Sequence, residues 1–140
     1  MMNWKMRAIE DLRHYKFMKL GIINSKERLA NIDSIIKPLL HMSKKHRTQK
    51  NQQFIDAVKE ADRLRQNISS AESVTTLVER ALESLTELER DTLDKFYIDN
   101  NHKPITVISD ELGCSERSLY RIRHEALEKF TLAMYGTAAS

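Results

Sequence analysis

Apolar residues recur at near-heptad spacing over the first part of this chain of 140 residues. The stripe consists of Ala8, Leu12, Tyr15, Met18, Ile22, Leu29, Ile32, Ile36 and Leu39. Such a stripe lines one face of a helix for packing against another helix. Between Asn3 and about Leu40 it predicts one long helix, or two joined end to end, with an interruption at Gly21. Pro38 predicts an end or a kink near residues 36–37.

A second stripe begins near Gln53 and continues without a break for about four heptads. It consists of Ala57, Ala61, Leu64, Ile68, Ala71, Thr75, Val78, Leu82 and Leu85. This spacing is typical of a coiled-coil seam. Two long helices joined by a connection predict an antiparallel, coiled-coil-like hairpin over residues 1–84, although each helix could instead pair with a copy of itself. A lone hairpin has a thin core, so we expect a homodimer.

The connection between the two stripes, about residues 41–53, is polar and basic. It has no apolar periodicity and no acidic residue, and its basic residues include Lys44, Lys45 and Arg47. One interpretation is a solvated loop. The other is that Lys44, Lys45 and Arg47 make a supplementary contact to the phosphates of a nucleic acid.

Two short helix patterns follow in the stretch Thr86–Phe130. The first begins with a T-x-x-E capping box made by Thr86 and Glu89 and runs to about Tyr97. The pattern consists of Leu88, Thr92, Leu93 and Phe96, which follow one another at helical spacing. After a turn-forming segment the second runs from about Thr106 to Leu112. Thr106 is the expected N-cap of this second helix, and its expected inward positions are Val107, Ile108 and Leu112.

The third helix pattern follows a tight turn. Gly113 ends the preceding helix, and Ser115 caps the next one, which extends to about Met134. Its buried stripe is expected at Leu119, Ile122, Ala126, Leu127 and Phe130. A short helix, a tight turn and a longer helix form the helix-turn-helix arrangement, whose second helix enters the DNA major groove. The alternative is a plain packing module.

Two arginines on this third helix favour the DNA-binding interpretation. Arg117 and Arg121 lie one turn apart and can point the same way. Arginine suits guanine because its planar fork donates two hydrogen bonds at once. Exposed arginines on a helix can also be merely solvated, so this feature indicates a DNA-reading face without establishing one.

The stretch Leu85–Phe130 resembles the C-terminal DNA-binding region of bacterial sigma factors, which reads the promoter −35 element. The matching segments are LTELER at residues 85–90, TVISDELG at 106–113, SERSLYRI at 115–122 and Ala126-Leu127. In layout the whole chain resembles phage and prophage regulators of the ArpU and RinA type. The resemblance implies an all-α fold, with a helical hairpin followed by a sigma-like helix-turn-helix domain over residues 85–135. The loss of periodicity beyond Tyr135 predicts a frayed tail at 136–140.

The resemblance also implies roles for residues of the helix-turn-helix. It places base-reading side chains at Glu116, Arg117 and Arg121. The implied contacts to the DNA backbone are Thr106, Ser118, Tyr120, Arg123 and His124. Sigma factors carry a denser basic set on the reading helix than this chain does. Here four basic residues are offset by three glutamates, so a dimer or another basic segment would help binding.

The composition of the chain bears on its fold class, its partners and its location in the cell. Glycine (3) and proline (2) are scarce, which favours an all-α fold. The net charge of +3 is a weak indication of an anionic partner. Cys114 is the only cysteine, so no intrachain disulfide forms. No apolar run approaches the ~20 residues of a membrane span and no secretory signal is evident, so we expect a cytoplasmic protein without a membrane partner.

Motifs of enzymes are missing from the sequence. It contains no glycine-rich phosphate loop, no paired-histidine metal motif and no nucleophile elbow. We therefore expect no enzymatic activity, no cofactor and no metal. The leading hypothesis is a sequence-specific DNA-binding transcriptional regulator, encoded by a phage or prophage, with RNA polymerase as a further expected partner. The alternatives are a DNA-recognition subunit like that of phage small terminases and a coiled-coil protein-interaction module.

Overall fold

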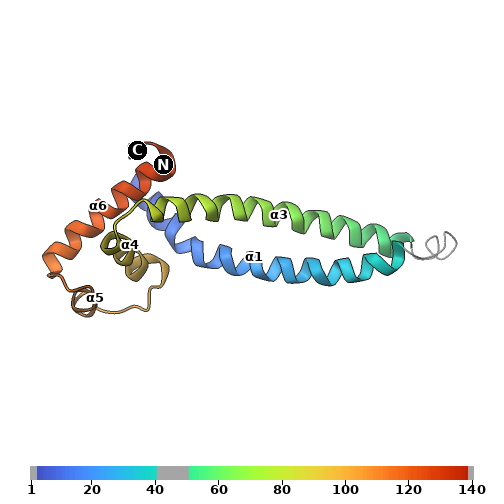
Figure 1. Ribbon diagram of the computed structural model, residues 1–140, viewed down its shortest axis with the longest axis horizontal. Helices are drawn as coiled ribbons and strands as arrows, with labels where there is room; N and C mark the ends of the chain where they lie inside the picture. The colour runs from blue at the N-terminus through green and yellow to red at the C-terminus, as the bar shows by residue number, and fades with distance from the viewer. Residues whose placement is uncertain (1–2, 41–50, 139–140) are drawn as a thin grey trace. The chain divides into compact units, whose positions relative to one another are not determined.

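The computed structural model describes residues 3–40 and 51–138, and this described part of the chain consists of helices and short connections, without a strand. Figure 1 shows the helices. Their bounds are α1 Trp4–Leu40, α3 Asn51–Glu83, α4 Glu87–Leu93, the π-helical turn η1 Asp94–Ile98, α5 Ile105–Leu112 and α6 Glu116–Tyr135. The expected all-α class is therefore confirmed. In the described ranges no helix is both long enough and apolar enough to cross a membrane.

The chain forms two compact units. The first contains the residues up to Met18 together with those from Val74 onward, and the second contains Lys19–Ser73. Helices α1 and α3 each contribute to both units. The boundary expected after residue 84 thus lies inside the first unit, and the end of α3 belongs with the C-terminal helices.

In the second unit, α1 and α3 lie side by side and run in opposite directions. Lys26 pairs with Glu72 at 3.0 Å, and Asp33 pairs with Arg65 at 3.0 Å. The later residue of α1 therefore pairs with the earlier residue of α3, as expected for antiparallel helices. Buried residues of the two predicted stripes fill the contact: Ile22 and Leu39 on α1, and Ala61, Leu64 and Ile68 on α3.

Helix α1 is continuous through the residues expected to interrupt it. It passes Gly21 and includes Pro38, so of the end or kink predicted near residues 36–37, the end is wrong. A proline removes the hydrogen bond to the carbonyl four residues earlier. Pro38 lies in the last turn of α1, where this loss affects one bond near the end of the described helix and leaves the preceding turns intact.

The core of the first unit joins residues that are far apart in the sequence. It contains Ala8 and Leu12 of α1, Val78, Ala81 and Leu82 of α3, Leu85, Leu93 of α4, Tyr97 of η1, and Ala126, Leu127 and Phe130 of α6. An alanine on each of α1, α3 and α6 leaves room for these helices to approach closely. The apolar face of α6 is therefore covered by the ends of both long helices as well as by α4 and α5, which also pack on it.

The start of α4 confirms the predicted capping box. The Glu89 N–H donates to Thr86 Oγ1 at 3.2 Å, and the Thr86 N–H donates to Glu89 Oε1 at 3.0 Å. After Leu93 the helix widens into the π-helical turn η1. There the Asp99 N–H donates to the Asp94 carbonyl at 2.8 Å. This i→i+5 bond carries the helical segment to Ile98, one residue beyond the predicted end.

The buried face of α4 differs by one residue from the apolar pattern of its sequence. Leu88 is 38% exposed, whereas Glu89 is buried beside the expected Thr92 and Leu93. A buried carboxylate needs hydrogen-bond and charge partners. Glu89 has both, in the backbone of Thr86 and in the ammonium group of Lys129. An apolar pattern alone does not detect a glutamate that is satisfied in this way.

Candidate nucleic-acid interface

The turn between α5 and α6 is fixed by local hydrogen bonds. Gly113 adopts the left-handed conformation, with φ 70°, and its N–H donates to the Asp110 carbonyl at 3.3 Å. The Cys114 N–H donates to the Ser109 carbonyl at 3.1 Å, which completes a Schellman motif. Ser115 then caps α6 by accepting from the Ser118 N–H at 3.1 Å. The predicted stop at Gly113 and cap at Ser115 are both confirmed.

The beginning of α5 differs from the prediction. The N-cap is Pro104, whose carbonyl accepts from the Ile108 N–H at 3.2 Å, and Thr106 lies inside the helix with its side chain exposed. Val107, expected to face inward, is 39% exposed, and Ser109 is buried in its place. The Ser109 hydroxyl is satisfied by the Thr106 carbonyl at 2.9 Å. A cap at Pro104 starts the helix earlier than a cap at Thr106 would.

Helix α6 presents two faces, as its sequence predicted. All five stripe residues, Leu119, Ile122, Ala126, Leu127 and Phe130, are buried. The three expected base-reading residues, Glu116, Arg117 and Arg121, are all exposed at its N-terminal end. Arg121 lies 4.0 Å from Glu125, and Arg117 has no ion pair with any described residue. Both guanidinium groups are thus available to an external acceptor.

The residues expected near DNA phosphates occupy different positions. Thr106 is exposed on α5, and the Ser118 hydroxyl lies 3.0 Å from that of Ser115, within the cap of α6. Tyr120, Arg123 and His124 line a pocket, and the side chains of Tyr120 and His124 are also exposed to solvent. The supplementary residues Lys44, Lys45 and Arg47 fall outside the described residues.

The pocket formed with Tyr120, Arg123 and His124 has a volume of about 430 Å³. Its other walls come from Tyr97 of η1 and from Lys5 and Arg13 of α1. The sequence did not identify these two α1 residues as part of a site. Lys5, Ile9 and Arg13 lie four positions apart, in the row beside the buried Ala8 and Leu12. The spacing of this row can be seen in the sequence, but only the fold shows that the row lies against α6.

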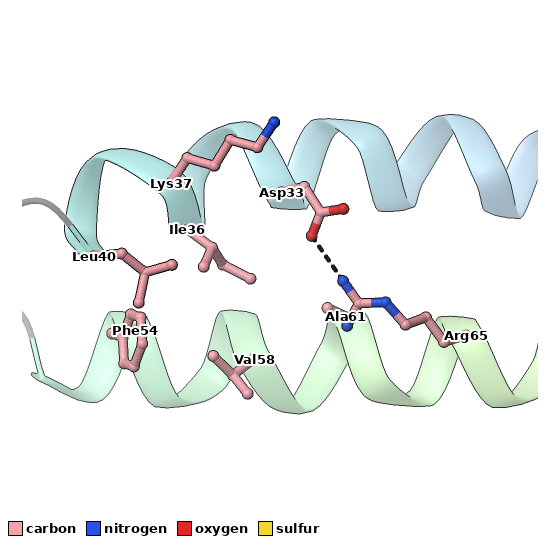
Figure 2. Close-up of a pocket in the computed structure, with 8 residues that line it drawn as sticks. All are labelled: Asp33, Ile36, Lys37, Leu40, Phe54, Val58, Ala61 and Arg65. Carbon is pink, nitrogen blue, oxygen red and sulfur yellow. Dashed lines mark hydrogen bonds and ion pairs between the residues drawn. The ribbon is translucent and has the colours of Figure 1, made fainter.

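The second unit contains a different kind of pocket. Figure 2 shows it between α1 and α3, with a volume of about 400 Å³. Its lining is mainly apolar and includes Ile36, Leu40, Phe54 and Val58. The Asp33–Arg65 ion pair closes one side. This pocket has no convergent polar groups beyond that pair and Lys37, so it offers packing surface and little chemistry.

Within residues 3–40 and 51–138, no three histidine, cysteine, aspartate or glutamate residues gather in a way that could hold a metal ion. Comparison of the chain with models of known families, with curated proteins and with solved structures gives no match.

Proposed function

We propose that this protein is a sequence-specific DNA-binding regulator in which α6 enters the major groove. The observation that carries the proposal is the placement of Arg117 and Arg121. They lie on consecutive turns at the exposed N-terminal end of the helix that follows a Schellman turn. In helix-turn-helix proteins this end of the second helix contacts base edges.

The electrostatic state of the two arginines supports this role. A guanidinium held by a carboxylate would have to break that pair before it could donate to guanine N7 and O6. Arg117 has no such pair among the described residues, and the contact of Arg121 with Glu125 is long, at 4.0 Å, and exposed. An exposed pair of this length is worth little. Little free energy would therefore be lost in breaking existing ion pairs when these side chains bind guanine.

The resemblance to sigma factors over Leu85–Phe130 is the second support. In this proposal α4, η1, α5 and α6 form the sigma-like domain, and α1 with α3 forms the long hairpin. Thr106, Ser118, Tyr120, Arg123 and His124 would lie beside the phosphates, while Lys44, Lys45 and Arg47 would add a contact. A regulator of this type acts in the cytoplasm on phage or prophage promoters, with RNA polymerase as a partner.

A homodimer is part of the proposal. One α6 carries nearly balanced charge, so a single copy neutralises few phosphates, and two copies double that number. The long helices also carry apolar side chains that the single chain leaves open to solvent. Phe17, Val74 and Leu77 of the first unit are examples. Light scattering should give the mass of two chains. A closed ring of more copies would favour the terminase-like alternative.

The test is selection from a random duplex library, with the Arg117→Ala/Arg121→Ala double variant run in parallel. We expect the parent to enrich a motif containing guanine and the variant to lose it. A motif with two-fold symmetry would also report the dimer. Enrichment of the same motif by both proteins would refute the assignment of α6 to the groove. No enrichment by either would refute intrinsic sequence-specific binding.

A further inference from the structure

The pocket of the first unit collects positive charge from two distant parts of the chain. Lys5 and Arg13 reach it from α1, while Arg123 and His124 reach it from α6. No aspartate or glutamate is among the residues that line it. With three permanent cations around about 430 Å³, the pocket has an unbalanced positive potential.

The cations of the pocket are held by aromatic rings rather than by acids. The Arg123 guanidinium lies 4.9 Å from the Phe96 ring centroid and 5.1 Å from that of Tyr120. The Arg13 guanidinium lies 5.9 Å from the Tyr97 ring centroid. Neither arginine forms an ion pair with another described residue. A ring face orients a guanidinium but uses none of its N–H donors in the guanidinium plane, so these remain for an anion.

Two further features support an anion site. Burial raises the pKa of Tyr97, although Arg123 and Arg13 act to lower it, so the Tyr97 hydroxyl stays protonated and can donate. His124 lies 3.7 Å from Glu128. That glutamate is one turn further along α6 and does not line the pocket.

We propose that this pocket binds a phosphate group. A phosphate presents several acceptor oxygens in different directions, which suits donors that approach from α1, η1 and α6. A planar carboxylate would leave part of this donor set unused. Arg13 and Arg123 supply the main contacts, and Lys5 adds charge. The phosphate comes either from a DNA backbone next to α6 or from a free phosphorylated molecule. The first source rests on the proposed DNA-binding function, and the second does not.

The test of the site itself uses small phosphates at constant ionic strength. Inorganic phosphate and ribose 5-phosphate are titrated into the full chain while the fluorescence of Trp4 is followed. Trp4 is the only tryptophan, and its ring lies 5.9 Å from that of His124 at the pocket wall. Arg13→Gln removes one donor from an exposed side chain and should weaken binding about tenfold, the usual loss of one charged hydrogen bond. Arg28→Gln, an exposed arginine elsewhere on α1, is the matched control.

The DNA arm measures binding to a selected and to a scrambled duplex over a range of salt. A residue that contacts a phosphate weakens binding to both duplexes equally and lowers the salt slope by about one when it is removed. We expect this behaviour from Arg13→Gln and Arg123→Gln, with unchanged far-ultraviolet circular dichroism. Arg117→Ala should instead weaken the selected duplex alone.

The outcomes separate the pocket from the proposed function. Saturable binding of either small phosphate that Arg13→Gln weakens supports the pocket with a free molecule as its source, even if the parent binds no DNA. If Arg13→Gln weakens binding to both duplexes equally and neither small phosphate binds, the DNA backbone is supported as the source of the phosphate. If Arg13→Gln changes neither arm, the pocket proposal is overturned, whether or not the parent binds DNA.

Discussion

Lys129 of α6 donates to the carboxylate of Glu89 on α4, with 2.8 Å between Nζ and Oε2. The Glu89 side chain is only 8% exposed, and its other oxygen closes the capping box with Thr86. One carboxylate thus satisfies the start of α4 and also ties α4 to the helix that carries Arg117 and Arg121. The positions of α6 and of α4 depend on the same ionised group.

The ionisation of Glu89 should make the stability of the first unit sensitive to acid. Burial opposes the charge, but the hydrogen bonds from Lys129 and Thr86 outweigh it and hold the pKa of Glu89 below its ordinary value of 4.5. A carboxyl whose pKa is lowered by folding stabilises the fold fully above its unfolded pKa. That contribution is lost as the pH falls through the folded value. Glu89→Gln removes the contribution at neutral pH.

We expect Glu89→Gln to lower the free energy of unfolding at pH 7 by about 1 kcal/mol, because Lys129 is half-exposed and the pair is screened. The difference from the parent should shrink below about pH 4. Urea denaturation at several pH values measures it. Glu87→Gln, an exposed residue on the first turn of the same helix, is the control and should cost less. A constant difference across pH would show that the charge of Glu89 is not what stabilises α4.

The N-terminal end of α1 should be required for the stability of the C-terminal helices. Leu12 is completely buried in the core shared with α6, so Leu12→Ala should cost about 2–5 kcal/mol. Leu20→Ala lies on the same helix at a side chain that is 54% exposed, and should cost close to nothing. Urea denaturation followed by Trp4 fluorescence and circular dichroism compares them. Equal losses would show that α1 does not complete this core.

Substitution by alanine should change the stability of the chain in opposite directions at Gly21 and at Gly113. A Cβ at Gly21 would meet no heavy atom within 4 Å, and the residue is helical, so Gly21→Ala should stabilise the chain by about 0.5–1 kcal/mol. Gly113 has φ +70°, which disfavours a side chain, so Gly113→Ala should destabilise it by about 1 kcal/mol. Thermal denaturation gives both signs. A stabilising Gly113→Ala would contradict the Schellman turn.

Arg117→Ala and Arg121→Ala should each weaken binding to the selected DNA site by about 1–3 kcal/mol, the worth of a bidentate contact with guanine. Binding to a scrambled duplex should change much less. Arg63→Ala, an exposed arginine on α3 paired with Glu60, controls for loss of positive charge alone. Fluorescence anisotropy with both duplexes measures the ratio of the affinity for the selected site to the affinity for the scrambled duplex. A uniform loss on both duplexes would reassign these arginines from bases to phosphates.

Local signals in the sequence determined much of this structure. The stripes on α1, α3 and α6, the capping box at Thr86, the stop at Gly113 and the cap at Ser115 all depend on residues within a few positions of one another. Such features are fixed by helical periodicity and by hydrogen bonds along one segment. The resemblance to sigma factors also rests on such segments.

Tertiary packing decided the rest. Glu89 is buried because Lys129 reaches it from a helix 40 residues later, and in α5 it is Ser109 rather than Val107 that is buried. Lys5 and Arg13 become pocket residues because Ala8 and Leu12, in the adjacent row of α1, enter the core beside α6. Each of these outcomes depends on a partner far away in the chain. These outcomes are set by the free energy of packing the whole core, which cannot be read from a local sequence pattern.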